Sequence, residues 1–305
     1  MFKKINKAKN TFQKTIVLTF SVSAVLGILF LGNYIAKAVT PGGAGHNNLI
    51  QRDKNDKIVP GYDVVICDSG CEYDSIYTAF NTEGDDKTYH ISRGTYTESN
   101  NITFPSDSVI HFDQATINFE TNNNYVNNTG TGTYASGILT IEGKGTSANS
   151  IVLSIGGSNN IYQNLNTRVI LETNTTATEF YPVILTGSFN DFGDIDIRDI
   201  DLTDTGTSTL FSVSALTHSR ANLTVYNIDF NTSDYLTAVN FKNNSLYNVF
   251  EIKIQDIQNS VSNAYGLLVD SGSNYNSIYG NSATTKTDDV ADNGTSNKVA
   301  NISED

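Results

Sequence analysis

The sequence predicts an all-β fold: a right-handed parallel β-helix solenoid with a short N-terminal capping α-helix. The main observation is a repeat of 28 to 30 residues in the second half of the chain. It is marked by isoleucines 30, 28 and 29 residues apart, at Ile170, Ile200, Ile228 and Ile257. A fixed period of this size is typical of a chain that stacks one supersecondary unit on the next. Because the apolar runs are short, alternating and β-branched, the repeated unit is predicted to consist of strands.

Residues 74–80 predict the capping helix. Asp74 is placed as its N-cap, Ile76, Ala79 and Phe80 share one face, and Gly84 ends the element. The first coil of a strand solenoid exposes an open edge and an apolar cross-section. A short amphipathic helix at this point covers both.

The chain divides into four predicted parts. Residues 1–38 combine five early lysines, an apolar stretch and Ala36-Lys37-Ala38, as expected of a signal peptide or of an N-terminal anchor that is not cleaved. Residues 39–61 form a linker, 62–281 the β-helix domain and 282–305 a polar tail. Within the β-helix, residues 121–134 are expected to be a polar loop that projects from one coil. The protein is therefore predicted to be exported, and to be secreted or associated with the cell surface.

Charge and cysteine content limit the partners. The full chain carries a formal charge of −13, and residues 1–38 hold six of its 19 basic residues and none of its 32 acidic ones, so the remainder carries 13 minus 32, or −19. Such a chain repels nucleic acid, and membrane contact is expected only if residues 1–38 are retained. Cys67 and Cys71 are predicted to form a disulfide, since a metal site would have only Asp68 and Glu72 nearby as further ligands.

Several segments resemble the pectin-lyase-like superfamily of single-stranded right-handed parallel β-helices. Residues 74–80 resemble its capping helix, residues 93–98 (Arg-Gly-Thr-Tyr-Thr-Glu) an early turn, and residues 115–118 (Ala-Thr-Ile-Asn) a strand that follows. Residues 266–269 and 274–281 are similar to its generic coils. The resemblance covers most of residues 62–281 and implies the fold. It does not imply one activity, because the superfamily includes lyases, hydrolases, esterases, epimerases, tailspikes and non-catalytic surface proteins.

Alignment on the isoleucines predicts which side chains share a row. Ile197, Val225 and Ile254 should form a second inward stack, three residues before the first. The resemblance implies a polar ladder at Asp199, Asn227 and Asp256, with Val169 as the member that departs from it. Arg168, Arg198 and Tyr226 are expected to align on the outward face, and Asp201 with Asp229.

The outward face is the candidate functional site. Asp194, Asp196, Asp201 and Asp229 make it acidic, and Ca²⁺ could relieve the repulsion between carboxylates on neighbouring coils. The resemblance to polysaccharide lyases implies Ca²⁺ ligands at Asp196, Asp201 and Asp229, with Arg198 as the catalytic base. The alternative is a set of solvated side chains in which Arg198 offsets the charge of its neighbours. The characteristic lyase, polygalacturonase and pectin methylesterase motifs are missing, which favours the second interpretation.

The leading hypothesis is therefore a non-catalytic surface protein that contacts polysaccharide or another surface. Arg168 and Tyr226 are its candidate carbohydrate contacts. Further tyrosines offer possible sugar contacts, namely Tyr125, Tyr134, Tyr162, Tyr247 and Tyr275. A Ca²⁺-dependent polysaccharide lyase or related enzyme is the alternative, and a tailspike-like fibre module, which would be a trimer, is a third.

Overall fold

The computed structural model describes residues 51–52, 58–59, 61–121, 124–145, 151–173, 179–202, 207–230, 236–259, 264–284 and 290–300. The chain divides into two units, residues 1–49 and 50–305, and every described residue belongs to the second. The predicted signal or anchor lies outside the described residues, as does most of the linker. Two short strands in the linker, β1 (Gln51–Arg52) and β2 (Ile58–Val59), pair antiparallel.

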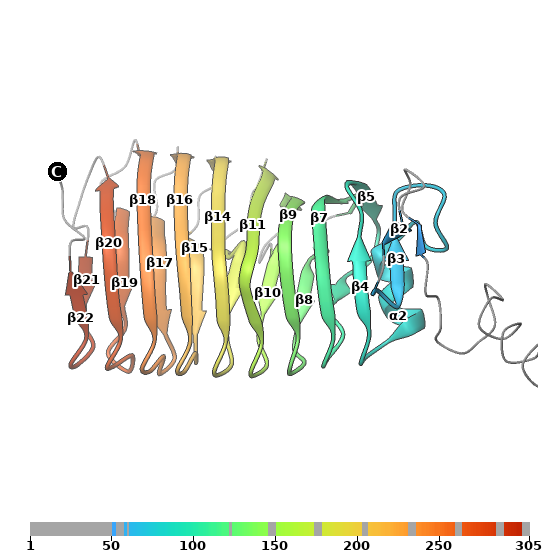
Figure 1. The fold of residues 1–305 in the computed structure, drawn as a ribbon. Helices are drawn as coiled ribbons and strands as arrows, with labels where there is room; N and C mark the ends of the chain where they lie inside the picture. Colours follow the sequence, from blue (N-terminus) through green and yellow to red (C-terminus); the bar gives the residue numbers. More distant parts are fainter. Residues whose placement is uncertain are drawn as a thin grey trace, which may run out of the picture. The chain divides into compact units, whose positions relative to one another are not determined.

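The fold is a parallel β-helix, as predicted. The chain passes alternately through two parallel sheets, so that strands of one sheet come from successive coils (Figure 1). The larger sheet has eleven strands within the described residues: β3 (Val64–Ile66), β4 (Thr88–Ile91), β5 (Gly94–Glu98), β7 (Val109–Phe119), β9 (Tyr134–Gly145), β11 (Ile161–Thr173), β14 (Asp191–Leu202), β16 (Arg220–Phe230), β18 (Val249–Asn259), β20 (Ser277–Thr284) and β22 (Lys298–Ala300).

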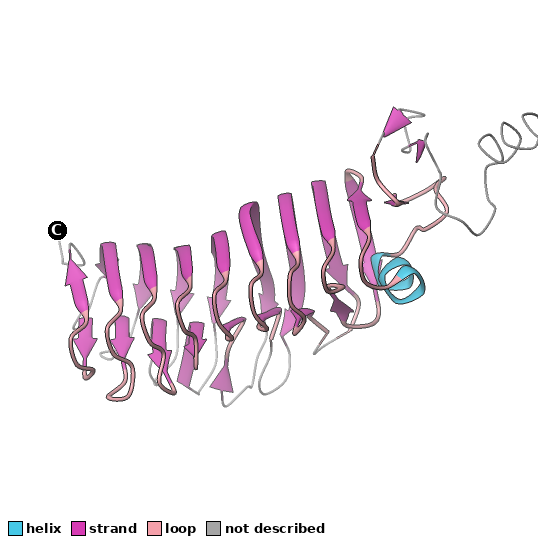
Figure 2. Ribbon diagram, turned by 60° about the horizontal axis from the view of Figure 1, so that its bottom comes forward, coloured by secondary structure: helices cyan, strands magenta, loops and turns pink. Residues whose placement is uncertain are grey.

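The smaller sheet has nine described strands: β6 (Ile102–Thr103), β8 (Val126–Asn128), β10 (Leu153–Ile155), β12 (Glu179–Phe180), β13 (Val183–Leu185), β15 (Thr207–Ser214), β17 (Leu236–Lys242), β19 (Ala264–Val269) and β21 (Val290–Asp292). Short turns join its strands to those of the larger sheet and lie side by side along one edge (Figure 2). The last rung, β21 and β22, lies in the segment expected to be a polar tail.

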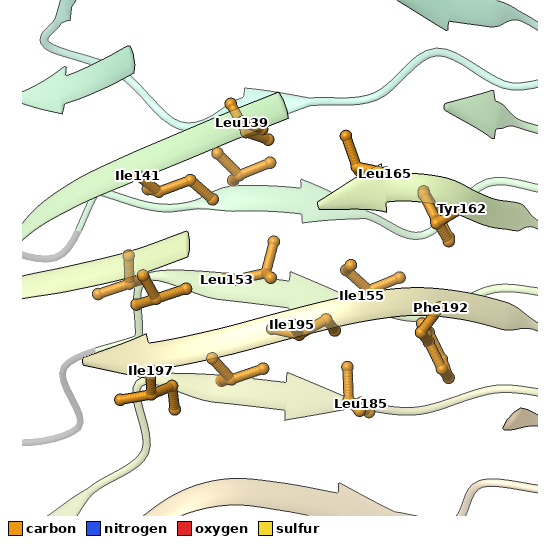
Figure 3. Close-up of a cluster of buried hydrophobic side chains, with 14 of the residues drawn as sticks. Leu139, Ile141, Leu153, Ile155, Tyr162, Leu165, Leu185, Phe192, Ile195 and Ile197 are labelled. Carbon is orange, nitrogen blue, oxygen red and sulfur yellow. The ribbon is translucent and has the colours of Figure 1, made fainter. Parts of the chain in front are cut away.

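The core lies between the two sheets and consists of inward stacks of apolar side chains (Figure 3). Ile197, Val225 and Ile254 pair in register and are fully buried, as the repeat predicts. Larger rings stack in the same way: the Tyr162 and Phe192 ring centroids are 6.2 Å apart with an interplanar angle of 3°. Each coil therefore presents its apolar side chains to the coils before and after it.

Helix α2 (Ile76–Glu83) covers the first coils through Ile76, Ala79 and Phe80, which are buried as predicted. Phe80 packs edge-on against Tyr89, with ring centroids 4.8 Å apart. The predicted N-cap was one residue too early. The N-cap is Ser75 and not Asp74: Ser75 has extended backbone angles, and its hydroxyl accepts the Thr78 N–H at 3.1 Å.

The disulfide and the segment at residues 121–134 were both predicted from the sequence. Cys67 and Cys71 form the predicted disulfide, with Cα atoms 5.7 Å apart. The predicted loop at residues 121–134 was wrong in its middle, where β8 pairs with β6 and β10. Its Val126 is fully buried, and Asn128 donates to the Tyr162 hydroxyl within the core. The strand is therefore paired on both sides, with one apolar and one hydrogen-bonded polar side chain directed into the core.

Candidate functional site

The candidate site lies on the outward side of the larger sheet, where in-register pairing aligns polar side chains into rows. One row runs Asn166–Asp194–Asn222–Glu251 across β11, β14, β16 and β18. The next, two residues further along each strand, runs Arg168–Asp196–Thr224–Lys253. Because alternate residues of a strand point to the same face, both rows lie on the outside of the solenoid.

A groove of about 240 Å³ lies across these strands. We call it the flank groove, and it is lined by Asn166, Asp194, Asp196, Asn222, Leu223, Thr224, Glu251 and Lys253. Seven of the eight lining side chains are polar, so the groove offers amide, hydroxyl, carboxylate and ammonium groups. This mixture suits a ligand with many hydroxyl groups.

Each carboxylate of the flank groove already has a donor. Asp196 is 7% exposed and contacts the Arg198 guanidinium at 2.5 Å. Asn222 donates to Asp194 at 2.8 Å, and Lys253 lies 3.1 Å from Glu251. The negative charges of the groove are therefore partly balanced within it.

The predicted catalytic and metal residues are only partly brought together. Arg198 pairs in register with Tyr226, and Asp201 with Asp229, as aligned from the sequence. The side chains of Asp201 and Asp229 lie outside what the structure describes. Among the described side chains, no group of three or more His, Cys, Asp or Glu is arranged to hold a metal ion.

The alignment of Arg168 was wrong by two residues. Arg168 pairs with Asp196, and Val169 with Ile197, whereas alignment on Ile170 placed Arg168 beside Arg198. The cause is an irregularity in the pairing of β11 with β14. Ile161 pairs with Asp191 and Asn166 with Asp194, so β11 has two extra residues in this stretch.

The predicted polar ladder at Asp199, Asn227 and Asp256 is described only in part. Asn227 is exposed and has a φ of 54°, in the left-handed region that asparagine tolerates better than most residues. The backbone of β16 therefore departs from extended geometry at this position. The side chains of Asp199 and Asp256 lie outside the described part of the chain.

A different, buried polar ladder was missed by the sequence reasoning. It runs through the turns that lead from the smaller to the larger sheet. In each, a side-chain oxygen accepts the backbone N–H of the equivalent residue one coil earlier, along Asn160, Asn190, Ser219, Asn248, Asn276 and Asn297. The signal in the sequence was the recurrence of Asn every 28 to 30 residues from Asn160 to Asn276, interrupted by Ser219, with Asn297 following after 21 residues. This ladder fixes the register of every turn it passes through.

The tyrosines divide into buried and exposed sets. Tyr162 is fully buried, so it offers no face to a sugar. Tyr226 on the flank is 39% exposed, and Tyr247 and Tyr275 are 50% and 52% exposed. The last two lie in turns between the sheets and not on the outward face of a strand.

No protein-family model matches this sequence, and no curated protein matches it. Over the residues that the structure describes, no helix is both long enough and apolar enough to cross a membrane.

Proposed function

We propose that this chain is an exported, non-catalytic protein of the pectin-lyase-like superfamily that binds polysaccharide. The flank groove carries the proposal, because its polar side chains form a shallow site on a rigid sheet. The parallel β-helix and its capping helix support the assignment to the superfamily. Residues 1–38 and the disulfide at Cys67 and Cys71 support export.

The pairing within the groove favours binding over catalysis. A base needs an accessible lone pair, but the Arg198 guanidinium donates to Asp196 and is part of an ion pair. The amides of Asn166 and Asn222 and the hydroxyl of Thr224 remain suited to sugar hydroxyls. These groups are rigidly held because each comes from a central strand of the sheet.

The experiment is a retention assay with the purified protein on cellulose, xylan, mannan and polygalacturonate, in Ca²⁺ and in chelator. Unsaturated products and new reducing ends are recorded at the same time. We expect retention without product. Asn222→Ala should weaken retention severalfold, while Thr97→Ala, which is exposed on β5 away from the groove, should leave it unchanged.

Other outcomes select other functions. Ca²⁺-dependent product would overturn the non-catalytic proposal in favour of a lyase, with Arg198 as base and Asp196, Asp201 and Asp229 as metal ligands. A stable trimer by light scattering, with neither retention nor product, would instead support a fibre module.

A further inference from the structure

Four aromatic side chains form a continuous exposed column along one edge of the solenoid. Phe189, His218, Tyr247 and Tyr275 occupy the same place in four successive turns from the smaller to the larger sheet. Their ring centroids are 5.0, 5.0 and 5.1 Å apart, with interplanar angles of 16°, 24° and 8°. We call this set the aromatic column.

Equivalent hydrogen bonds show that these turns are the same turn repeated. The backbone N–H of Phe189 donates to the Thr217 carbonyl at 3.0 Å, and that of His218 to the Leu246 carbonyl at 3.1 Å. The preceding coil has the same bond from Asn159 to Ser188 at 3.1 Å. Asn159 therefore holds the position before Phe189 in the series.

The turn does not need aromatic residues. All four members of the aromatic column have φ between 52° and 59°, a region that bulky residues seldom adopt. The coils on either side place Asn159 and Ser296 there, with φ of 59° and 60°. Asparagine tolerates this conformation more readily, so the column costs backbone energy that the fold does not require.

The column is also more exposed than a structural stack would need to be. Phe189 is 59% exposed, and Tyr247 and Tyr275 are each at least half exposed. Two residues after Tyr247, the apolar side chain of Val249 is also 46% exposed. Stacking between neighbouring rings contributes about 0.5–1.5 kcal/mol per pair, but it does not account for apolar edges left in water. A contiguous exposed aromatic stripe is a candidate interaction site.

The arrangement of the rings decides which ligand fits. Their faces are turned toward one another along the solenoid axis, so a ligand meets ring edges, the two tyrosine hydroxyls and the His218 imidazole. These contacts recur once per coil, which suits a linear polymer lying along the axis. The net charge of −13 repels nucleic acid, anionic lipid and acidic polysaccharide.

We infer that the aromatic column is a second polysaccharide-binding site, and that its ligand is an uncharged polysaccharide chain aligned with the solenoid axis. The hydroxyl-rich chain hydrogen-bonds to Tyr247, Tyr275 and His218, while its less polar ring surfaces cover the exposed ring edges. The inference rests on the proposed function and narrows its substrate class.

The test replaces the column by the residue that the turn already accepts. The double variant Tyr247→Asn/Tyr275→Asn should keep the fold, because Asn159 makes the same turn. Its affinity for whichever of cellulose, xylan or mannan retains the native protein should fall at least tenfold. Val109→Thr is the matched control, since this apolar side chain is 41% exposed on β7 and lies outside the column and the flank groove. The single variant Phe189→Asn repeats the test at the end of the column if the double variant unfolds.

The outcomes separate this inference from the proposed function. If the column variants bind polysaccharide as the native protein does while Asn222→Ala loses binding, the column is not a binding site. The proposed function at the flank groove then still stands. Retention of the native protein on polygalacturonate alone overturns the inference that the ligand is uncharged. Failure of the native protein to bind any of the four polysaccharides overturns both proposals.

Discussion

The backbone N–H of Ile76 donates to Oε1 of Glu98 across 2.7 Å and ties the first turn of α2 to the end of β5. The other carboxylate oxygen accepts the Ser75 hydroxyl at 3.0 Å. Glu98 is 3% exposed, so these bonds replace its hydration. A single carboxylate, 22 residues from Ile76 in sequence, thus accepts hydrogen bonds from both the N-cap and the first turn of the helix that covers the first coil.

Glu98→Ala should destabilise the protein by about 2–3 kcal/mol, because it leaves the Ile76 N–H and the Ser75 hydroxyl without their acceptor. Glu98→Gln retains one carbonyl oxygen for Ile76 and should cost clearly less. Urea denaturation followed by circular dichroism measures both. Equal losses in the two variants would show that the charge, and not the hydrogen bond, holds the helix.

The same carboxyl should make stability depend on pH. Burial raises the pKa of Glu98 above its ordinary value of 4.5, although hydrogen bonds from Ser75, Ile76 and Tyr77 lower it in part. Between 4.5 and the raised pKa the folded chain holds a proton that the unfolded chain has lost, so the free energy of unfolding falls as the pH rises through this window.

Glu98→Gln removes this titration. The difference in unfolding free energy between native protein and variant should therefore change across the window and level off above it. A difference that stays constant from below pH 4.5 to neutral pH would contradict the assignment.

Asn248→Ala should cost about 2–4 kcal/mol, since its side chain accepts the Ser219 N–H at 3.0 Å and donates to the Leu216 carbonyl at 2.8 Å. Asn222→Ala is the matched control: this asparagine is exposed, and its side chain donates to Asp194. Its loss should cost less than about 1 kcal/mol. Thermal unfolding of the two variants measures this difference. Similar losses of stability would show that the ladder bonds of Asn248 contribute no more than the exposed bond of Asn222.

Two ion pairs of the larger sheet should differ in strength. Arg198→Ala leaves the buried Asp196 without its cation and should cost about 1–3 kcal/mol. The Arg220 side chain is 59% exposed where it meets Asp191, so Arg220→Ala should cost about 0–1 kcal/mol. Chemical denaturation at low and high salt tests both. The reverse order would mean that solvent reaches Asp196 freely.

The disulfide should contribute about 2 kcal/mol, since it closes a loop of only a few residues. Urea midpoints with and without reductant measure this contribution. The unfolded protein should show no free thiol before reduction, and any titratable thiol would contradict the bond between Cys67 and Cys71.

The fold could be predicted from sequence because the inward stacks repeat with a nearly constant period. Ile197, Val225 and Ile254 were placed correctly for this reason. Arg168 was misplaced because the two extra residues in β11 shift the register without disturbing the apolar pattern around Ile170. A side chain on the outside has no packing requirement that would reveal such a shift.

The buried ladder and the aromatic column escaped prediction for a different physical reason. Both occupy turns, where the backbone conformation is shared but the side chains vary: Ser219 replaces asparagine, and His218 stands between Phe189 and Tyr247. The column residues share a positive φ and the ladder residues share a side-chain hydrogen bond to the neighbouring coil, and neither feature is visible in residue types alone. The pairing of Asp194 with Asn222 and of Asp196 with Arg198 also escaped prediction, because it depends on side-chain geometry.

The ladder also makes the coil a unit that genetic rearrangement can remove or copy. Ser219 and Asn248 hold equivalent sites 29 residues apart. An in-frame loss of residues 219–247 would join His218 to Asn248, whose side chain could accept the Asn190 N–H as Ser219 does. Duplication of the same segment would add a rung and one more ring to the edge. The number of coils, and of rings along this edge, is therefore open to evolutionary adjustment in whole steps, without redesign of either end.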